Sequence, residues 1–310
     1  MIAFLFPGQG SQKVGMGKAL AEAYPEARAV YDEADAALGW SLSKLCFEGP
    51  VEELTLTANA QPAILATSIA ALRVLARKTD LRPGVVAGHS LGEYSALVAA
   101  GALRLADAVK VVNLRGKFMQ EAVAPGEGAM AAIVNLDRAG VEAACAEAAR
   151  ELGAVVSPAN HNGGGQIVIA GAKAAVDRAA ALCKERGGKA IPLKVSAPFH
   201  CALMKPAADR LATELARVEL AAPAVPVVTN VEAAPSTDPA RLRALLVEQV
   251  TAPVRWEESV QKMVAMGARR AVEVGAGNVL AGLCKRIAPE LPVAGAGEPD
   301  AIAALETGGA

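Results

Sequence analysis

The sequence predicts an α/β protein with a largely parallel sheet, and three features of the 310-residue chain support this class. Short apolar segments alternate with longer amphipathic ones, which is the pattern of strands connected by helices. The chain is 53% hydrophobic with a net charge of −1, so it has a large core and is not intrinsically disordered. Lys and Arg total 31 against 32 Asp and Glu, and aromatic residues make up only 3%, which disfavours nucleic-acid binding.

The expected strands are short apolar runs spread along the chain, and none of them suggests a membrane segment. The first run is too short for a signal peptide and lacks a basic flank, and no run reaches transmembrane length. The five cysteines are widely scattered, without a disulfide framework or a C-x-x-C zinc motif. We therefore expect a reduced, cytoplasmic protein without a metal site. The strands are expected at residues 2–6, 85–88, 130–134, 155–159, 167–170, 190–195, 225–230 and 271–274.

The middle of the chain has a different order of elements. From about residue 127 to 195 the pattern is strand, helix, strand, strand, helix, strand, with the helices at 138–152 and 172–186 and a turn-rich segment at 160–165. This order is typical of the ferredoxin-like arrangement. We expect a small ferredoxin-like subdomain at 126–196, inserted into a larger α/β subdomain formed by 1–125 and 197–310.

The most informative motif is Gly88-His89-Ser90-Leu91-Gly92, which follows an apolar strand and precedes a helical segment. Gly-x-Ser-x-Gly in this context makes a tight strand-to-helix turn with the serine hydroxyl exposed at its apex. The N–H of Leu91 and the positive helix end would stabilise an oxyanion there. The alternative is an ordinary glycine turn with a serine N-cap, and the context favours Ser90 as a nucleophile.

A serine nucleophile needs a base, and the chain has three histidines. His200 follows an expected strand, beside a proline that interrupts regular structure, and is the preferred base. His161 lies in a polar Asn-His-Asn-Gly segment and is expected to be solvated, whereas His89 is expected to pack beside the turn. Asp209 is expected on a solvent face, so an acidic triad member is not evident. A backbone carbonyl or an amide is an alternative partner for the imidazole.

Arg115 falls within the apolar stripe of an expected helix at 107–123. A buried guanidinium needs a partner, which is either an internal carboxylate or a carboxylate-bearing ligand, and the helix alone does not decide between them. The segment Phe6-Pro7-Gly8-Gln9-Gly10 fails the dinucleotide pattern, because its third glycine would fall at Lys13. Gln9 is better placed to supply a second oxyanion N–H.

Five motifs occurring in order carry a family resemblance over residues 4–287. The chain resembles bacterial malonyl-CoA:acyl carrier protein transacylases and the acyltransferase domains of polyketide and animal fatty acid synthases. The resemblance implies an α/β-hydrolase-like core with a ferredoxin-like insert. The motifs are Phe6-Pro7-Gly8-Gln9-Gly10-Ser11-Gln12, Gly88-His89-Ser90-Leu91-Gly92-Glu93-Tyr94, Arg115-Gly116-Lys117-Phe118-Met119-Gln120, Pro198-Phe199-His200 and Glu248-Gln249-Val250.

The resemblance also implies roles for individual residues. Ser90 would be acylated, His200 would be its base, and Gln249 would help to orient His200. Backbone N–H groups of Gln9 and Leu91 would form the oxyanion hole, and Arg115 would bind the malonyl carboxylate. Other residues that match pocket positions are Gln61, Met119 and Asn162. Phe199 departs from many stand-alone members, which have a small residue there, and its ring is expected to favour malonyl over methylmalonyl.

The activity implied is transfer of malonyl from malonyl-CoA to the phosphopantetheine thiol of acyl carrier protein, supplying fatty acid synthesis. No cofactor is implied, and a monomer is expected. The alternatives are an acyltransferase serving a polyketide synthase, a serine esterase or thioesterase, and a non-catalytic carrier-binding module. The joint presence of a nucleophile, a base and a buried arginine disfavours the last two.

Overall fold

The computed structural model describes residues 1–193, 195 and 197–307, which form two separate β-sheets. The larger sheet has the strand order β10-β9-β1-β2-β7-β8, and its neighbours pair in parallel except for β7 and β8. The smaller sheet has the order β4-β5-β3-β6 and is antiparallel throughout. The mixed α/β class with a parallel sheet is therefore confirmed, and a second, antiparallel sheet accompanies it.

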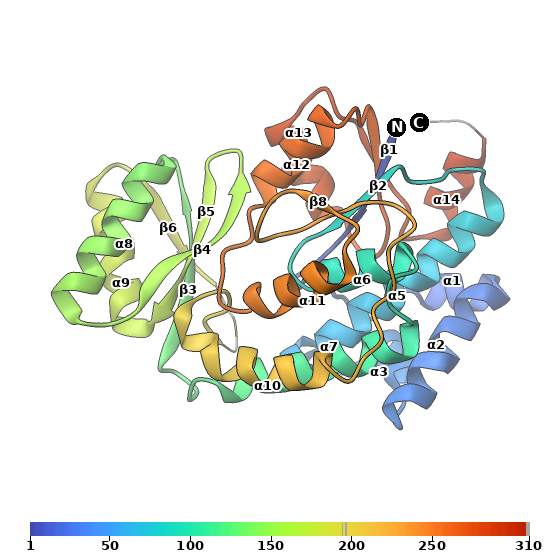
Figure 1. The fold of residues 1–310 in the computed structure, drawn as a ribbon, viewed down its shortest axis with the longest axis horizontal. Coiled ribbons are helices and arrows are strands. Elements are labelled where there is room, and N and C mark those ends of the chain that lie inside the picture. Colours follow the sequence, from blue (N-terminus) through green and yellow to red (C-terminus); the bar gives the residue numbers. More distant parts are fainter. Residues whose placement is uncertain (194, 196, 308–310) are drawn as a thin grey trace.

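Helices connect the strands along most of the chain (Figure 1). The strands are β1 (Ile2–Phe6), β2 (Val85–Gly88), β3 (Gly128–Val134), β4 (Val156–Gly163), β5 (Gln166–Ala172), β6 (Lys189–Pro192), β7 (Val227–Val228), β8 (Pro235–Ser236), β9 (Arg270–Glu273) and β10 (Val293–Gly295). The helices are α1 (Lys18–Ala23), α2 (Pro25–Leu38), α3 (Leu42–Glu48), α4 (Val51–Thr55), α5 (Thr57–Lys78), α6 (Gly92–Ala99), α7 (Leu105–Glu121), α8 (Arg138–Leu152), α9 (Lys173–Glu185), η1 (Ala202–Met204), α10 (Lys205–Leu215), α11 (Pro239–Glu248), α12 (Trp256–Ala265), α13 (Val279–Ile287) and α14 (Pro299–Glu306).

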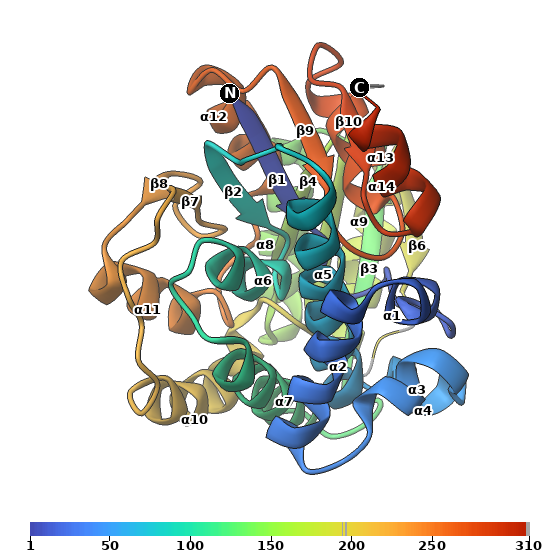
Figure 2. The same ribbon diagram turned by 90° about the vertical axis from the view of Figure 1, so that its right-hand side faces the viewer.

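The parallel sheet is buried on both faces. Successive side chains of a strand point in opposite directions and therefore enter two different cores. Phe4 and Phe6 of β1 belong to a core formed with α5, α6 and α7. Ala3 and Leu5 of the same strand belong to a second core formed with α12 and α13. Figure 2 shows α5 and α6 beside β1 and β2. The alternation explains why β1 reads as a continuous apolar run.

The antiparallel sheet has one face on helices and one face on the rest of the molecule. Ile133 and Ile169 pack with α8 and α9 in a separate core. Met130 and Val168, on the opposite face, belong to the core shared with the large sheet's helices. Figure 1 shows this sheet with α8 and α9 on the left, apart from the helices around the parallel sheet. The face that carries Met130 and Val168 lies near the carboxyl end of β2, where both residues line a cavity.

The structure corrects several element boundaries. The segment 160–165, expected as a loop, is mostly strand: β4 continues to Gly163, because the backbone of His161 and its neighbours pairs with β5 and bonds to Val254. The strand expected at 190–195 ends at Pro192, and position 194 lies outside the described residues. The strand expected at 225–230 is reduced to Val227–Val228.

The C-terminal segment is also more ordered than its composition indicates. After Pro292 the chain forms β10, which extends the parallel sheet, and then α14. No helix in the described part of the chain combines the length and the apolar character needed to cross a membrane.

Helix α7, which carries Arg115, packs very closely against the start of α5. A Cβ added to Gly116 would lie 2.6 Å from both Ala58 Cα and the carbonyl oxygen of Thr57. The side chain of Asn113 donates to the Ala58 carbonyl at 2.8 Å, and Gln120 Oε1 accepts from the Ala58 N–H at 2.6 Å. Glycine is required here because the two backbones touch.

We expect Gly116→Ala to lower the free energy of unfolding by about 1–3 kcal/mol, because the added methyl group forces two helix backbones apart. Urea denaturation followed by circular dichroism measures this change. The matched control is Gly282→Ala on α13, where nothing lies within 4 Å of the added Cβ. The control should raise stability by about 0.5–1 kcal/mol, the difference between glycine and alanine in a helix. Equal effects in the two variants would contradict the close packing.

Candidate active site

Ser90 lies at a strained turn between β2 and α6. Its φ is 52°, in the left-handed region that a non-glycine residue seldom adopts. The turn is tight enough that a Cβ on Gly88 would lie 1.9 Å from the carbonyl of Gly92, and one on Gly92 would lie 2.1 Å from the carbonyl of Phe6. The two glycines of the motif are therefore required by close backbone approach, and they leave the hydroxyl of Ser90 in the cavity.

His200 contacts Ser90 directly. Its Nε2 lies 2.7 Å from Ser90 Oγ, and its Nδ1 lies 2.7 Å from the backbone carbonyl of Gln249. A carbonyl can only accept, so Nδ1 carries the proton and Nε2 is free to accept the proton of Ser90. The partner of His200 is thus a backbone carbonyl, one of the alternatives left open by the sequence, and the side chain of Gln249 points elsewhere.

The environment makes His200 a neutral imidazole. The side chain is only 3% exposed, and burial lowers its pKa to about 3. The positive charge of Arg115 acts in the same direction, while the hydrogen bond to the Gln249 carbonyl opposes it. A neutral, correctly oriented base beside a serine hydroxyl is the arrangement needed for general-base catalysis.

Arg115 is buried without a carboxylate partner. It is 2% exposed, and no Asp or Glu oxygen of the described residues forms an ion pair with it. Its Nη1 donates to Gln61 Oε1 at 2.8 Å, and its Nη2 donates to Gln249 Oε1 at 2.9 Å and to Ser90 Oγ at 3.2 Å. Amide oxygens bond both terminal nitrogens, but Nε has no partner in the described residues and no carboxylate pairs with the guanidinium directly, which suits an anionic ligand.

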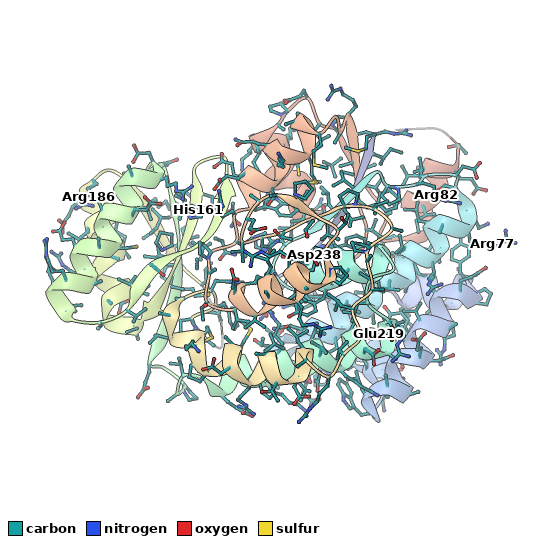
Figure 3. All side chains as sticks on the ribbon, viewed as in Figure 1. Arg77, Arg82, His161, Arg186, Glu219 and Asp238 are labelled. Carbon is teal, nitrogen blue, oxygen red and sulfur yellow. The ribbon has the colours of Figure 1, made fainter. Side chains whose placement is uncertain are left out.

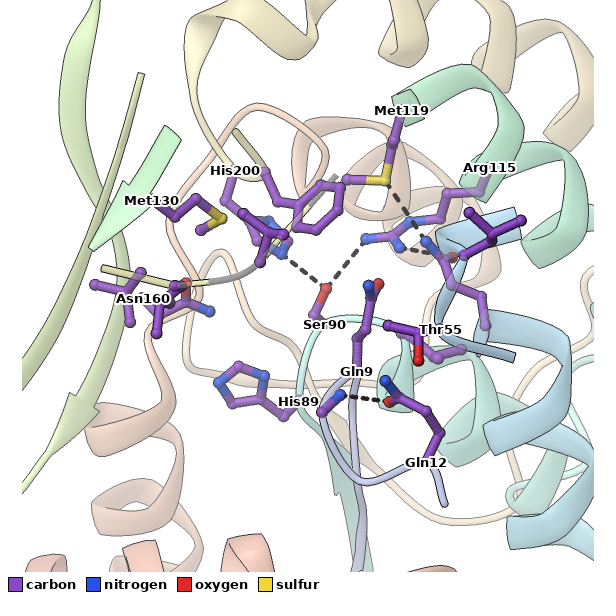
Figure 4. A pocket seen from close by; sticks show the side chains of 18 of the residues that line it. Gln9, Gln12, Thr55, His89, Ser90, Arg115, Met119, Met130, Asn160 and His200 are labelled. Atoms are coloured by element: carbon purple, nitrogen blue, oxygen red, sulfur yellow. Dashed lines mark hydrogen bonds between the residues drawn. The ribbon is translucent and has the colours of Figure 1, made fainter. Parts of the chain in front are cut away.

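The residues around Ser90 enclose one cavity of about 600 Å³ (Figure 4). Figure 4 shows His200 and Arg115 directed at Ser90 from two sides, with Gln9 beside them. Met130 and Val168 of the antiparallel sheet complete the wall. The cavity is lined by all the expected site residues except Gln249, which lies behind it: Gln9, Gln61, Ser90, Leu91, Arg115, Met119, Asn162, Phe199 and His200.

The expected oxyanion donors lie next to each other because β1 and β2 are parallel neighbours. Gln9 follows β1 and Leu91 follows Ser90, so both lie at the carboxyl edge of the sheet. In the described part of the chain no backbone carbonyl accepts from either N–H. Both N–H groups are therefore available for a ligand oxygen, as an oxyanion hole requires.

The remaining sequence candidates do not hydrogen-bond the Ser90 hydroxyl, although His89 also lines the cavity. His89 packs beside the turn as expected, with Nε2 2.9 Å from Asn162 Oδ1 and its ring 5.6 Å from that of Trp256. His161 is 4% exposed, so the expectation of a solvated histidine is wrong; it lies within β4 (Figure 3) and, unlike its neighbours Asn160 and Asn162, does not line the cavity. Asp209 is exposed and pairs with Lys205, as expected for a solvent face.

Two buried polar residues behind the cavity were not anticipated as site residues. Asn230 Oδ1 accepts the N–H of Ser90 at 2.6 Å, and its Nδ2 donates to the carbonyl of Gly88 at 2.7 Å. Glu93 accepts from the Asn230 N–H and from Gln249 Nε2, each at 2.9 Å. Their positions in the sequence are consistent with such a place: Asn230 is the last residue of an expected strand, and Glu93 belongs to the motif that contains Ser90.

The fold and site define an α/β protein with a serine–histidine pair on a strand-to-helix turn and a buried arginine beside it. The model of the acyl transferase domain family matches residues 3–292. The chain belongs to this family.

Similar proteins span nearly the whole chain. The malonyl CoA-acyl carrier protein transacylase of Escherichia coli is 54% identical over 303 residues, or 97% of each chain. That of Bacillus subtilis is 50% identical over 302 residues, 97% of this chain and 95% of the relative. A Vibrio cholerae acyl carrier protein S-malonyltransferase structure has a TM-score of 0.95 at 49% identity, covering 98% and 99% of the two chains. The solved complex of a type II PKS acyl-carrier protein with its malonyl-transacylase gives a TM-score of 0.96 at 46% identity, and the match covers 99% of this chain and 99% of the chain compared.

We expect His200 to remain neutral from pH 8 down to about pH 5, because burial and the Arg115 charge lower its pKa to about 3. An NMR titration of protein labelled at histidine carbons measures this, with the His200→Asn variant assigning the signal. The unfolded protein in urea is the control and should titrate near the usual histidine value. Since the folded pKa lies below the unfolded one, this residue's contribution to stability is lost as pH falls below about 6.5. A midpoint near that value in the folded protein would contradict the prediction.

Proposed function

We propose that this protein transfers a malonyl group from malonyl-CoA to the phosphopantetheine thiol of an acyl carrier protein, through a malonyl-Ser90 intermediate. The observation that carries the proposal is the unpaired Arg115 guanidinium, 3.2 Å from a serine oxygen that also bonds a neutral histidine. An acyl group attached to that oxygen and ending in a carboxylate would form an ion pair with the buried guanidinium. The activity for which the similar proteins are named supports the same proposal.

In the acylation step His200 Nε2 takes the proton of Ser90 Oγ as that oxygen attacks the thioester carbonyl. The resulting oxyanion accepts hydrogen bonds from the N–H groups of Gln9 and Leu91. The carbon–sulfur bond then breaks, and the leaving coenzyme A thiolate takes the proton from His200. The products are a malonyl ester of Ser90 and free coenzyme A.

The transfer step reverses these roles with a different thiol. His200 takes the proton of the phosphopantetheine thiol, whose sulfur attacks the malonyl ester carbonyl. The ester bond breaks, and Ser90 Oγ recovers the proton from His200. The same two N–H groups hold the second oxyanion, so one site serves both halves of a ping-pong reaction.

Selectivity follows from the cavity wall. An acetyl group leaves the charge of Arg115 without a ligand carboxylate, which costs transition-state stabilisation relative to malonyl. Phe199 is 8% exposed and lines the cavity next to His200. Its ring would crowd an α-methyl group, so methylmalonyl is expected to react more slowly than malonyl. Gln61, Met119 and Asn162 would shape the remaining wall.

The architecture proposed for this activity has two subdomains. Residues 1–125 and 197–310 would form an α/β-hydrolase-like subdomain, supported by the parallel sheet and the strand-to-helix turn. Residues 126–196 would form a ferredoxin-like subdomain, supported by the β-α-β-β-α-β order and the strand order β4-β5-β3-β6. We propose that the enzyme acts as a cytoplasmic monomer without a metal or redox cofactor.

A second candidate is the supply of extender units to a polyketide synthase. It is favoured by the likeness to the solved malonyl-transacylase bound to a type II PKS acyl-carrier protein. The chemistry at Ser90 would be identical, and only the carrier would differ. Comparing transfer rates to fatty acid and polyketide carriers distinguishes the two candidates.

Brief exposure to malonyl-CoA should add one malonyl group to Ser90, detected by intact-protein mass spectrometry and peptide mapping. The adduct should disappear on addition of phosphopantetheinylated acyl carrier protein, and Ser90→Ala should abolish it while sparing carrier binding. Methylmalonyl-CoA run in parallel should give less adduct. Accumulation of free malonate without carrier would instead indicate a hydrolase, and absence of both adduct and turnover would indicate a non-catalytic carrier-binding module.

Arg115→Ala should lower the rate of malonyl acylation at least about 100-fold, since a buried charge partner is removed. Acetyl acylation does not use this partner, so the preference for malonyl over acetyl should collapse. The matched control is Arg210→Ala, which removes an exposed arginine paired with Glu121. Retention of the malonyl preference in Arg115→Ala would contradict the role assigned to this residue.

A further inference from the structure

A carboxylate lies fully buried behind the cavity. Glu93, on the first turn of α6, is 1% exposed. Its Oε2 accepts hydrogen bonds from the Asn230 N–H and from Gln249 Nε2, each at 2.9 Å. Its Oε1 has no hydrogen-bond partner in the described residues. A carboxylate placed in this way destabilises the fold, so packing alone does not account for it.

The side-chain amide of Gln249 lies between Glu93 and Arg115. Its Nε2 donates to Glu93, and its Oε1 accepts from Arg115 Nη2 at 2.9 Å. An ionised carboxylate can only accept hydrogen bonds and a guanidinium can only donate them. The amide between them therefore has one favourable orientation, with its oxygen toward Arg115. The opposite orientation would direct an NH₂ group at the guanidinium.

This orientation bears on where Arg115 lies. Nη2 bonds both Gln249 Oε1 and Ser90 Oγ, so the amide oxygen helps to hold the guanidinium against the cavity. Glu93 itself does not line the cavity; it is connected to Arg115 by hydrogen bonds through the amide, and the two charges also attract each other directly. A residue in this place acts on the ligand through its neighbours.

We infer that Glu93 is a positioning residue for acyl selectivity: through the Gln249 amide it holds the Arg115 guanidinium where a malonyl carboxylate would bind. This inference rests on the proposed function, which assigns the carboxylate-binding role to Arg115. It goes further by adding a residue whose side chain contacts neither the substrate site nor the hydroxyl of Ser90.

The energetics of the carboxylate agree with a functional reason for it. Burial raises the pKa of Glu93 to about 7, opposed by the bonds from Asn230 and Gln249 and by the charge of Arg115. Tyr94, the other titratable group that interacts with it, is neutral at this pH because burial raises its own pKa. A folded pKa above the unfolded value means that stability is lost as pH rises from about 4.5 to 7. Above that range the ionised group costs stability.

The test compares three variants with the wild type in single-turnover acylation by malonyl-CoA and by acetyl-CoA. In Glu93→Ala the amide loses its shortest and only charged acceptor, and its Nε2 keeps the Ser90 carbonyl at 3.1 Å and Asn230 Oδ1 at 3.4 Å. The malonyl-to-acetyl rate ratio should fall at least about tenfold, as for a lost hydrogen bond to a charged group. Glu93→Gln keeps an acceptor, which the Asn230 N–H orients, and should restore the ratio to within about threefold. It should also unfold no more readily than the wild type at pH 8.

Glu273→Ala is the matched control. Glu273 is also a fully buried carboxylate and accepts from the N–H groups of Leu280 and Ala281, but it does not line or adjoin the cavity. Its variant should lose stability without changing the ratio. Equal losses for both substrates in Glu93→Ala, or no loss for either, would overturn the inference. The Arg115→Ala variant tests the proposed function separately. If the malonyl-to-acetyl rate ratio falls in Arg115→Ala but is unchanged in Glu93→Ala, only the positioning role of Glu93 is refuted.

Discussion

The site is organised around the positive charge of Arg115, which is buried and makes no ion pair with a carboxylate of the described residues. Gln61 and Gln249 supply amide oxygens from distant parts of the chain, and both bond the guanidinium while leaving its charge available. The close approach of α7 and α5 at Gly116 keeps Arg115 within reach of Gln61. The charge also contributes to the low pKa of His200, so the proposed carboxylate-binding group and the proposed base are electrostatically linked.

Of the four non-glycine residues with positive φ in the described part of the chain, two are the serine and the histidine of the site; the others are Asn135 and Ala233. Ser90 and His200 both have positive φ, at 52° and 59°, although neither is glycine. Such conformations persist only where the surroundings enforce them. Around Ser90 the enforcement comes from Asn230, which bonds the backbone on both sides of the turn, at Ser90 and at Gly88. The strained conformation of the turn places the Ser90 hydroxyl within hydrogen-bond distance of the His200 imidazole.

The sequence carried the local features of this protein better than the long-range ones. Ser90 was predictable because a strand, two glycines and a helix are adjacent in the chain, and His200 because few histidines compete with it. The partners of Arg115 were not, since Gln61 and Gln249 lie 54 and 134 residues away. His161 was misjudged because a polar, glycine-rich segment resembles a loop, yet its backbone is paired with β5 and Val254. Short strands such as β7 and β10 have too few residues to show a periodicity.

Gln249 contributes to the site through its backbone and its side chain independently, because His200 bonds only its main-chain carbonyl. A carboxylate in a catalytic triad can be lost by a single substitution, but every amino acid at position 249 would still present a carbonyl oxygen. The side chain at the same position meets Arg115 and Glu93 instead. Under the proposed roles, a change at position 249 would vary acyl preference while His200 keeps its carbonyl partner, so a new extender-unit specificity would not require passage through an inactive enzyme.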